Sequence, residues 1–236
     1  MELSVVIPVF DECDNLRPLA AEVRAALEPG VDYELIFVDD GSRDGSARVL
    51  AELRAESPRV RVLRHAHNQG QSAALLSGLL AARAPWVATL DGDGQNDPAD
   101  IPGLLALARA DESLWLVCGW RRQRRDGWLK RLSSRVANAV RARLLGDATP
   151  DTGCGLKLIR REPALALPRF DHMHRFLPAL VLQAGGGVRS VPVHHRPRRH
   201  GRSKYGLGNR LWVGLVDLAG VAWLGRRALR ARARED

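Results

Sequence analysis

The stretch Trp86-Val87-Ala88-Thr89-Leu90-Asp91-Gly92-Asp93-Gly94-Gln95 joins a short apolar run to a cluster of oxygen-bearing side chains. The apolar half is typical of a buried β-strand. In an extended chain alternate side chains point the same way, so we expect Asp91, Asp93 and Gln95 to face one point. Carboxylate and amide oxygens suit a hard divalent cation such as Mg²⁺ or Mn²⁺. The alternative is a surface turn rich in aspartate and glycine.

Outward from this stretch, strand-like and helical segments alternate along the chain. The predicted strands are residues 3–9, 34–38, 60–63 and 86–90, and the predicted helices are residues 15–27, 44–54, 71–83 and 101–109. Such repeats predict an α/β fold in which right-handed crossovers join parallel strands. Ligands bind beyond the carboxyl ends of such strands. Acidic clusters at residues 11–12, 39–40 and 91–95 all lie at such ends, which predicts a single site for a nucleotide and a metal.

The second half of the chain is less regular and more basic. The pattern changes after residues 114–118. A basic helix is predicted over 128–145, and the glycines at 151–155 permit tight turns or the close approach of a ligand. An apolar run at 156–159, a helix over 173–183 and a strand over 188–193 follow, and a cationic loop is expected at 194–206.

Size and charge limit the classes of protein that fit. A chain of 236 residues with 45% hydrophobic content can bury the core of one domain. The net charge is +9, and basic residues crowd into 121–143, 189–210 and 226–234. This asymmetry predicts an anionic partner for the second half: nucleic acid, anionic lipid or a phosphorylated substrate. The first residues lack the basic start of a secretory leader, and no uncharged run is long enough for a membrane span.

Cysteine and histidine do not suggest a further metal site. Three cysteines, an odd number, are spread along the chain, which fits a reducing compartment better than a disulfide framework. Five histidines of the second half show no clear metal-ligand spacing: His172, His174, His194, His195 and His200.

Taken together, these motifs resemble family 2 glycosyltransferases of the GT-A fold, and among them the polyprenyl-phosphate hexosyltransferases of the dolichyl-phosphate mannose synthase type. The similar segments, in the order of the family, are residues 6–12, 38–42, 68–70, 91–95, 119–121, 130–138, 151–157 and 201–205. The resemblance implies a Rossmann-like, mostly parallel central sheet flanked by helices. It places a catalytic domain at residues 1–205 and leaves residues 206–236 as a C-terminal amphipathic helix.

The resemblance also implies roles for individual residues. The nucleotide-sugar site would comprise Pro8, Val9, Phe10, Glu12, Phe37, Asp39, Asp91, Gly92 and Asp93. The metal site, for Mg²⁺ or Mn²⁺, would comprise Asp91, Asp93 and Gln95. Catalysis, including the binding of both phosphate groups, would involve Asp93, Arg121, Lys130, Ser134, Arg198 and Lys204. Lys130 stands where arginine is common in the family, and glycines at 92 and 94 replace larger residues, which is expected to loosen the metal motif.

The implied reaction is the inverting transfer of a hexose from GDP-hexose or UDP-hexose to a polyprenyl phosphate. A phosphate acceptor is already ionised at neutral pH, so it needs orientation more than a general base. One alternative is a family 2 enzyme with a glycan hydroxyl acceptor, for which Asp151 is the candidate base. Another is a nucleic-acid-binding protein, which is disfavoured because aromatic residues are not interleaved with the basic patches. The sequence indicates no particular oligomeric state.

The apolar segment 207–224 is predicted to be an amphipathic helix on the membrane surface. It contains Asp217, which disfavours a span, and arginines follow it. Its apolar residues at helical spacing are Leu211, Trp212, Leu215, Leu218, Ala219, Ala222 and Trp223. We expect a cytoplasmic protein attached peripherally to the inner face of the membrane. The alternative is that this helix packs on the domain or forms a dimer contact.

Overall fold

The computed structural model describes residues 1–122, 140–198 and 210–227. Its strands are β1 (Leu3–Val9), β2 (Tyr33–Asp39), β3 (Val60–Arg64), β4 (Trp86–Thr89), β5 (Leu114–Trp120), β6 (Lys157–Arg160) and β7 (Gly187–Pro192). Its helices are α1 (Cys13–Leu27), α2 (Ser46–Glu56), α3 (Gln71–Ala81), α4 (Ile101–Ala110), α6 (Arg161–Leu165), α7 (Leu177–Gln183) and α8 (Arg210–Arg227). Two short 3₁₀ turns are η1 (Pro98–Asp100) and η2 (Met173–Arg175).

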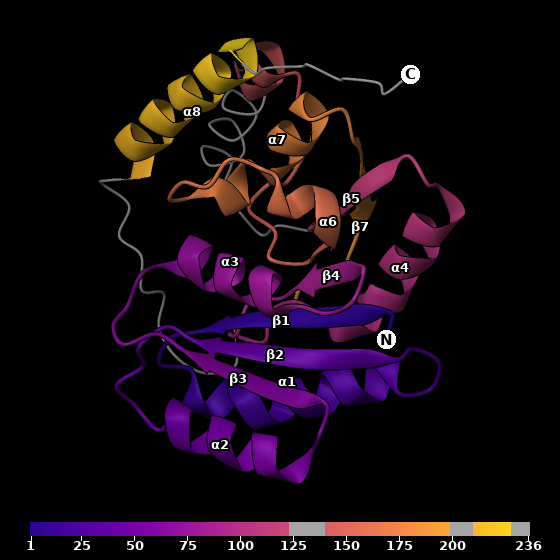
Figure 1. Cartoon of the computed structure of the whole chain (residues 1–236), viewed down its shortest axis with the longest axis vertical. Helices are drawn as coiled ribbons and strands as arrows, with labels where there is room; N and C mark the ends of the chain where they lie inside the picture. Colours follow the sequence, from indigo (N-terminus) through magenta and orange to yellow (C-terminus); the bar gives the residue numbers. More distant parts are fainter. Residues whose placement is uncertain (123–139, 199–209, 228–236) are drawn as a thin grey trace, which may run out of the picture.

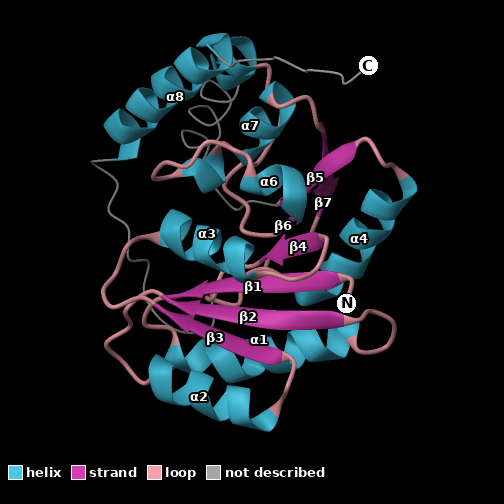
Figure 2. Ribbon diagram, viewed as in Figure 1, coloured by secondary structure: helices cyan, strands magenta, loops and turns pink. Residues whose placement is uncertain are grey.

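One seven-stranded sheet forms the centre of the molecule, in the order β3-β2-β1-β4-β6-β5-β7. Strand β6 is antiparallel to its neighbours β4 and β5. All the remaining strands of the sheet run in one direction. Helices cover both faces of the sheet (Figures 1 and 2). The predicted mostly parallel α/β fold is therefore confirmed, and the reversed strand β6 lies in its middle.

Alternate residues of the strands point to opposite faces of the sheet and pack into two hydrophobic layers. Val5 and Ile7 of β1 pack with α1, α2 and α4, whereas Val6 packs on the other face with α3, α6 and α7. All three side chains are fully buried. A central strand buried on both faces explains why residues 3–9 form a continuous apolar run.

The predicted helix over residues 173–183 is divided into η2 and α7. Pro178 fits the first turn of α7, where no backbone N–H is needed for an intrahelical bond. Phe176 separates the two pieces at a non-helical backbone angle. Of the basic helix predicted over 128–145, residues 140–145 are described and are helical. Of the loop at 194–206, residues 194–198 are described, and His195 forms a β-bridge with Asn96.

Helix α8 packs one face on α7 and turns an apolar face outward. Val221 is buried, while Leu215, Val216 and Trp223 are 49%, 58% and 61% exposed. Asp217 faces His172, with Oδ2 of the aspartate 3.2 Å from Nδ1 of the histidine. Among the helices of the described residues, none has both the length and the apolar character that a bilayer crossing requires.

Candidate active site

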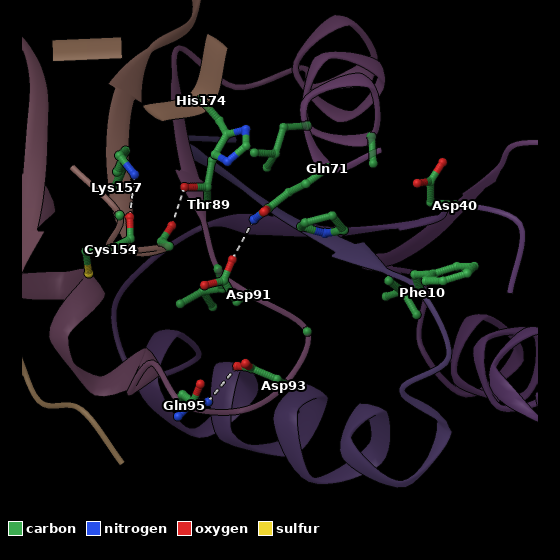
Figure 3. Close-up of a pocket in the computed structure, with 18 of the residues that line it drawn as sticks. Phe10, Asp40, Gln71, Thr89, Asp91, Asp93, Gln95, Cys154, Lys157 and His174 are labelled. Atoms are coloured by element: carbon green, nitrogen blue, oxygen red, sulfur yellow. Dashed lines mark hydrogen bonds between the residues drawn. The ribbon is translucent and has the colours of Figure 1, made fainter. Parts of the chain in front are cut away.

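A cavity of about 700 Å³ opens where the carboxyl ends of β1, β2 and β4 meet (Figure 3). Its wall includes ten of the residues that the sequence singled out: Pro8, Val9, Phe10, Glu12, Asp91, Gly92, Asp93, Gln95, Arg121 and Arg198. Residues as far apart in the sequence as Pro8 and Arg198 thus share one space. The acidic clusters at 11–12, 39–40 and 91–95 each contribute a side chain to it.

Two residues predicted for the nucleotide site lie outside this wall. Phe37 is fully buried in the layer between the sheet and α1, because its position in β2 points into the core, so the prediction for Phe37 is corrected. Asp39 is fully buried too, and its Oδ1 accepts the N–H of Ser42 at 2.9 Å. Its neighbour Asp40 lines the cavity instead. Three further predicted residues, Lys130, Ser134 and Lys204, lie outside the described residues.

Asp40 is held almost entirely by the loop that follows β3. It accepts the backbone N–H groups of Gln69 at 2.9 Å and Gly70 at 2.8 Å, and Nδ1 of His65 lies 2.7 Å from its Oδ1. Hydrogen bonds from two backbone amides fix the position of this carboxylate. Asp40 therefore joins the loops after β2 and β3 at the rim of the cavity.

The metal motif is a turn and not the extended chain that we expected. Residues 92–94 form the turn, Gly94 has a φ of 70°, and Oδ1 of Asp93 accepts the N–H of Gln95 at 3.1 Å. A Cβ at Gly92 would lie 2.8 Å from the carbonyl oxygen of Pro8, so this glycine lets the turn pack against β1. Asp91, Asp93 and Gln95 still line the same cavity, although alternation along a strand is not the reason.

Asp91 is a half-buried carboxylate whose charge is only partly compensated by its neighbours. Burial and the nearby charge of Asp93 raise its pKa to about 6, against the opposing effects of Lys157, Arg121 and a 2.8 Å hydrogen bond from Gln71 Nε2. A Cβ at Gly155 would lie 2.2 Å from Oδ2 of Asp91. The Asp91 carboxylate therefore fills the space that a side chain at position 155 would need.

This donor set fits a hard divalent cation. Two neighbouring carboxylates, with an amide oxygen beside them, offer the ligands that Mg²⁺ and Mn²⁺ prefer, and the charge of Asp93 raises the pKa of Asp91. Within the described residues, no group of three or more His, Cys, Asp and Glu side chains is arranged to hold a metal. Oxygens of water or of a bound ligand would have to complete the shell of such a cation.

Arg198 brings the start of the cationic loop onto the metal motif. Its Nη2 lies 2.7 Å from Oδ2 of Asp93, and its Nη1 lies 3.6 Å from Glu12. The preceding Arg196 anchors the segment, because its guanidinium contacts Glu22 at 2.7 Å and its N–H donates to the carbonyl of Gln95. Arg198 is therefore placed between the acidic residues of the nucleotide side and the metal motif.

Arg121 enters the cavity from the end of β5. It forms a bidentate salt bridge with Asp151: Nε lies 2.7 Å from Oδ2 and Nη2 lies 2.8 Å from Oδ1. Asp151 is buried and does not line the cavity. The carboxylate that the hydroxyl-acceptor alternative requires as a base is thus engaged in holding Arg121.

Sequence reasoning gave no role to five further residues of the wall: Asp40, Gln71, Lys157, His174 and Arg175. Asp40 was indistinguishable from Asp39 by pattern, since the register of β2 decides which of them faces the cavity. Lys157 is buried at the start of β6 and donates to the carbonyl of Cys154. The remaining residues lie at the start of α3 and in η2, where no motif marked them.

Comparison with known proteins identifies relatives along the whole chain. Residues 4–167 match the model of glycosyl transferase family 2. A dodecaprenyl-phosphate galacturonate synthase from Rhizobium johnstonii is 37% identical over 238 residues, which are 98% of this chain and 69% of that protein. An undecaprenyl-phosphate 4-deoxy-4-formamido-L-arabinose transferase from Edwardsiella ictaluri is 38% identical over 208 residues, 87% of this chain and 63% of that protein. The chain thus spans about two thirds of the length of these curated relatives.

Solved structures show the same fold at lower identity. Mannosyl-3-phosphoglycerate synthase from Rubrobacter xylanophilus superposes with a TM-score of 0.72 at 18% identity, over 100% of this chain and 79% of that one. Glucosyl-3-phosphoglycerate synthase from Mycobacterium tuberculosis, in complex with Mn²⁺, UDP-glucose and glycerol 3-phosphate, has a TM-score of 0.63 at 22% identity. It is matched over 95% of this chain and 77% of its own. At these identities the likeness concerns the fold.

Proposed function

Since this chain belongs to glycosyl transferase family 2, we propose that it transfers a sugar from a nucleotide-sugar to a polyprenyl phosphate. One observation carries this proposal. A single cavity holds the carboxylate pair Asp91 and Asp93 together with the cations Arg121, Lys157 and Arg198. The carboxylates suit a metal-bound diphosphate, and the cations suit a phosphate acceptor. The names of the two curated relatives also describe sugar transferases with polyprenyl phosphates.

In this proposal the donor lies along the carboxyl ends of the strands. Phe10, Glu12 and Asp40 line the end of the cavity that would take the nucleoside. Asp91, Asp93 and Gln95 would hold Mg²⁺ or Mn²⁺, which supplies positive charge to the leaving diphosphate. Arg198, now paired with Asp93, is placed to turn its guanidinium toward the same diphosphate. Asp39, Lys130, Ser134 and Lys204 keep their predicted roles as further parts of this proposal.

The acceptor phosphate needs positioning and no general base. An ionised phosphate oxygen attacks the sugar directly and inverts the anomeric centre, while the diphosphate leaves. Arg121 is held in place by Asp151, so it can present its remaining guanidinium edge to a phosphate. The same pairing disfavours a hydroxyl acceptor, because Asp151 is the base that such an acceptor would need.

Transfer assays with the full chain test this proposal. We would incubate the protein with radiolabelled UDP- and GDP-sugars, Mn²⁺ and a polyprenyl phosphate, and measure label that enters the lipid extract. We expect label only with the phosphorylated lipid, and none with the matched polyprenol, which lacks the phosphate. Label in a glycan acceptor, and none in the lipid, would support the hydroxyl-acceptor alternative and refute ours.

We also propose that α8 docks the protein on the cytoplasmic face of the membrane, where a polyprenyl phosphate resides. The exposed residues Leu215, Val216 and Trp223 lie on the outer face of α8, and Arg226 and Arg227 follow them. Apolar side chains beside arginines suit an interface of anionic lipid. In Figure 1, α8 lies at the end of the molecule remote from α2.

Vesicle binding tests the docking proposal. The double variant Val216→Ser with Trp223→Ser should bind phosphatidylglycerol vesicles at least about fivefold more weakly, because two apolar contacts with the bilayer are lost. Leu80→Ser is the matched control, since Leu80 is also exposed but lies on α3. Binding by the unsubstituted protein should weaken in high salt. Equal binding by the double variant and the control would mean that α8 serves a contact within or between protein chains.

A further inference from the structure

His174 projects into the cavity from η2, and the reaction proposed above gives it no role. Its Nδ1 lies 2.7 Å from Oγ of Ser72, which is buried at the start of α3. Among the described residues the ring makes no other hydrogen bond, so Nε2 remains for a molecule in the cavity. Ser72 thus fixes the ring and leaves its far nitrogen to a ligand.

The ring is neutral under ordinary conditions. Burial lowers its pKa to about 3, and the positive charges of Lys157 and Arg175 act in the same direction. A neutral imidazole carries one N–H donor and one acceptor nitrogen, which matches a hydroxyl group better than it matches a phosphate. It is also too weak a base to remove a proton from a hydroxyl at neutral pH.

The position of His174 along the cavity is opposite to that of the nucleoside residues. Phe10 and Asp40 follow β1 and β2, whereas Lys157 begins β6, two strands beyond β1 in the sheet. Figure 3 shows Phe10 and Asp40 at one end of the cavity, Lys157 and His174 at the other, and Asp91 between them. A nucleotide-sugar has the same linear order of nucleoside, diphosphate and sugar. With the diphosphate beside Asp91, the sugar lies at the end where His174 projects.

We propose that His174 recognises the sugar of the donor through a hydrogen bond between its Nε2 and a sugar hydroxyl, and thereby helps to select which sugar is transferred. This inference rests on the proposed function, because it takes the cavity to hold a nucleotide-sugar. The inference assigns a specificity residue to the end of the cavity that takes the sugar. The acidic residues near β1 and β2 would bind the nucleoside, which is the same in all sugar derivatives of one nucleotide.

Two substitutions separate the contact with Ser72 from the contact with the sugar. The amide of asparagine reaches the place of Nδ1, so His174→Asn keeps a partner for Ser72 and removes the group at Nε2. The longer glutamine brings an amide to the place of Nε2, so His174→Gln keeps a partner for the sugar. Only a role in sugar recognition makes glutamine the better replacement.

The measurement is the gain in affinity that the sugar brings. Titration calorimetry in Mn²⁺ gives the dissociation constants of UDP, GDP and a set of their sugar derivatives, which includes pairs that differ at one hydroxyl. We expect His174→Asn to leave the affinity for the nucleoside diphosphate within about twofold. The sugar derivative that the unsubstituted protein binds best should lose about tenfold in affinity, the scale of one hydrogen bond lost at a buried site. Its advantage over the derivative that differs at the recognised hydroxyl should shrink, and His174→Gln should restore much of it.

The possible failures are distinguishable. If the unsubstituted protein binds no sugar derivative better than the nucleoside diphosphate, the cavity does not hold a nucleotide-sugar and the proposed function fails with the inference. If a sugar contributes to binding and His174→Asn leaves that contribution unchanged, only the assignment of His174 is refuted. A variant that loses affinity for the nucleoside diphosphate as strongly as for its sugar derivatives would show a structural role, which also refutes the assignment.

Discussion

The two halves of the site hold their carboxylates in different ways. On the side of β1 and β2, Asp40 is bound by backbone N–H groups of its neighbouring loops. On the side of β5 and the cationic loop, carboxylates are bound by arginines, as in the pairs of Arg121 with Asp151 and Arg198 with Asp93. Backbone amides cannot leave, whereas a guanidinium can exchange one anion for another. The first half is therefore preformed for its ligand, and the second half contains pairs that a phosphate can compete for.

The largest effect should come from the carboxylates between the two halves. Asp93→Ala should lower transfer at least about a hundredfold, because it removes a group that would hold the cation at the leaving diphosphate. A chelator should abolish turnover by the unsubstituted protein, and added Mn²⁺ or Mg²⁺ should restore it. The measurement is label transferred to polyprenyl phosphate, and full activity in chelator would contradict the metal site.

Replacement of Arg198 should change activity and metal affinity in opposite directions. Arg198→Ala should lower transfer by about ten- to a hundredfold, because one cation for the diphosphate is lost. In the absence of nucleotide, the same variant should bind Mn²⁺ more tightly, since Arg198 no longer occupies Oδ2 of Asp93. Electron paramagnetic resonance of free Mn²⁺ measures this affinity.

Arg196→Ala is the matched control for this prediction. It removes the same charge from the same segment, but the Arg196 guanidinium contacts Glu22 and the carbonyl of Asn96 instead of Asp93. An equal gain in Mn²⁺ affinity for both variants would show a general effect of charge and not an exchange at Asp93.

On the preformed side, the effect should appear in stability. Asp40→Asn should lower the free energy of unfolding by about 1–3 kcal/mol, because its new amide group cannot accept both N–H bonds from Gln69 and Gly70. Urea unfolding measures this change, and the loss should vary little with salt because the donors of the two affected bonds, Gln69 N–H and Gly70 N–H, are uncharged backbone groups. A loss that disappears in high salt would contradict the contrast between the two halves.

The smallest predicted effect concerns pH and His174. The pKa of this residue is about 3 in the folded protein, below its ordinary value of 6.5, so the unfolded chain takes up a proton first as pH falls. Its contribution to stability is complete above pH 6.5 and is lost progressively below it. Between pH 7 and 5.5 the unsubstituted protein should lose about 1 kcal/mol relative to His174→Gln, which has no titrating group there. Parallel pH profiles of the two proteins would contradict a neutral, buried ring.

That the acidic clusters of the first half lie around one cavity could be predicted from the sequence, because the signals are local. Each acidic cluster directly follows a strand, and parallel strands bring their carboxyl ends together whatever lies between them. The choice between Asp39 and Asp40 was not predictable, because it depends on which residue of β2 is the last to face the core. The turn at residues 92–94 was also missed, since alternation in sequence does not reveal a positive φ at Gly94.

In the second half the missed residues depend on long-range topology. Lys157 and His174 reach the cavity because β6 is inserted antiparallel between β4 and β5, and because the following chain returns across α3. No periodicity in the sequence indicates that insertion. The cations of Arg121 and Arg198 were found through the family motifs, whereas their carboxylate partners became visible only in the structure.

Because Gly155 has no side chain, a single added methyl group at this position is expected to inactivate the enzyme. A methyl group at this position would lie 2.2 Å from Oδ2 of Asp91, so that carboxylate, which accepts a hydrogen bond from Gln71, would have to move. Gly155→Ala therefore alters no charge and removes no ligand, yet it displaces the centre of the metal motif. We expect the end of the cavity around Phe10 and Asp40, which is proposed to take the nucleoside, to stay intact. Such an inactive variant could be used to isolate complexes with donor nucleotides, because every titratable group of the protein is still in place.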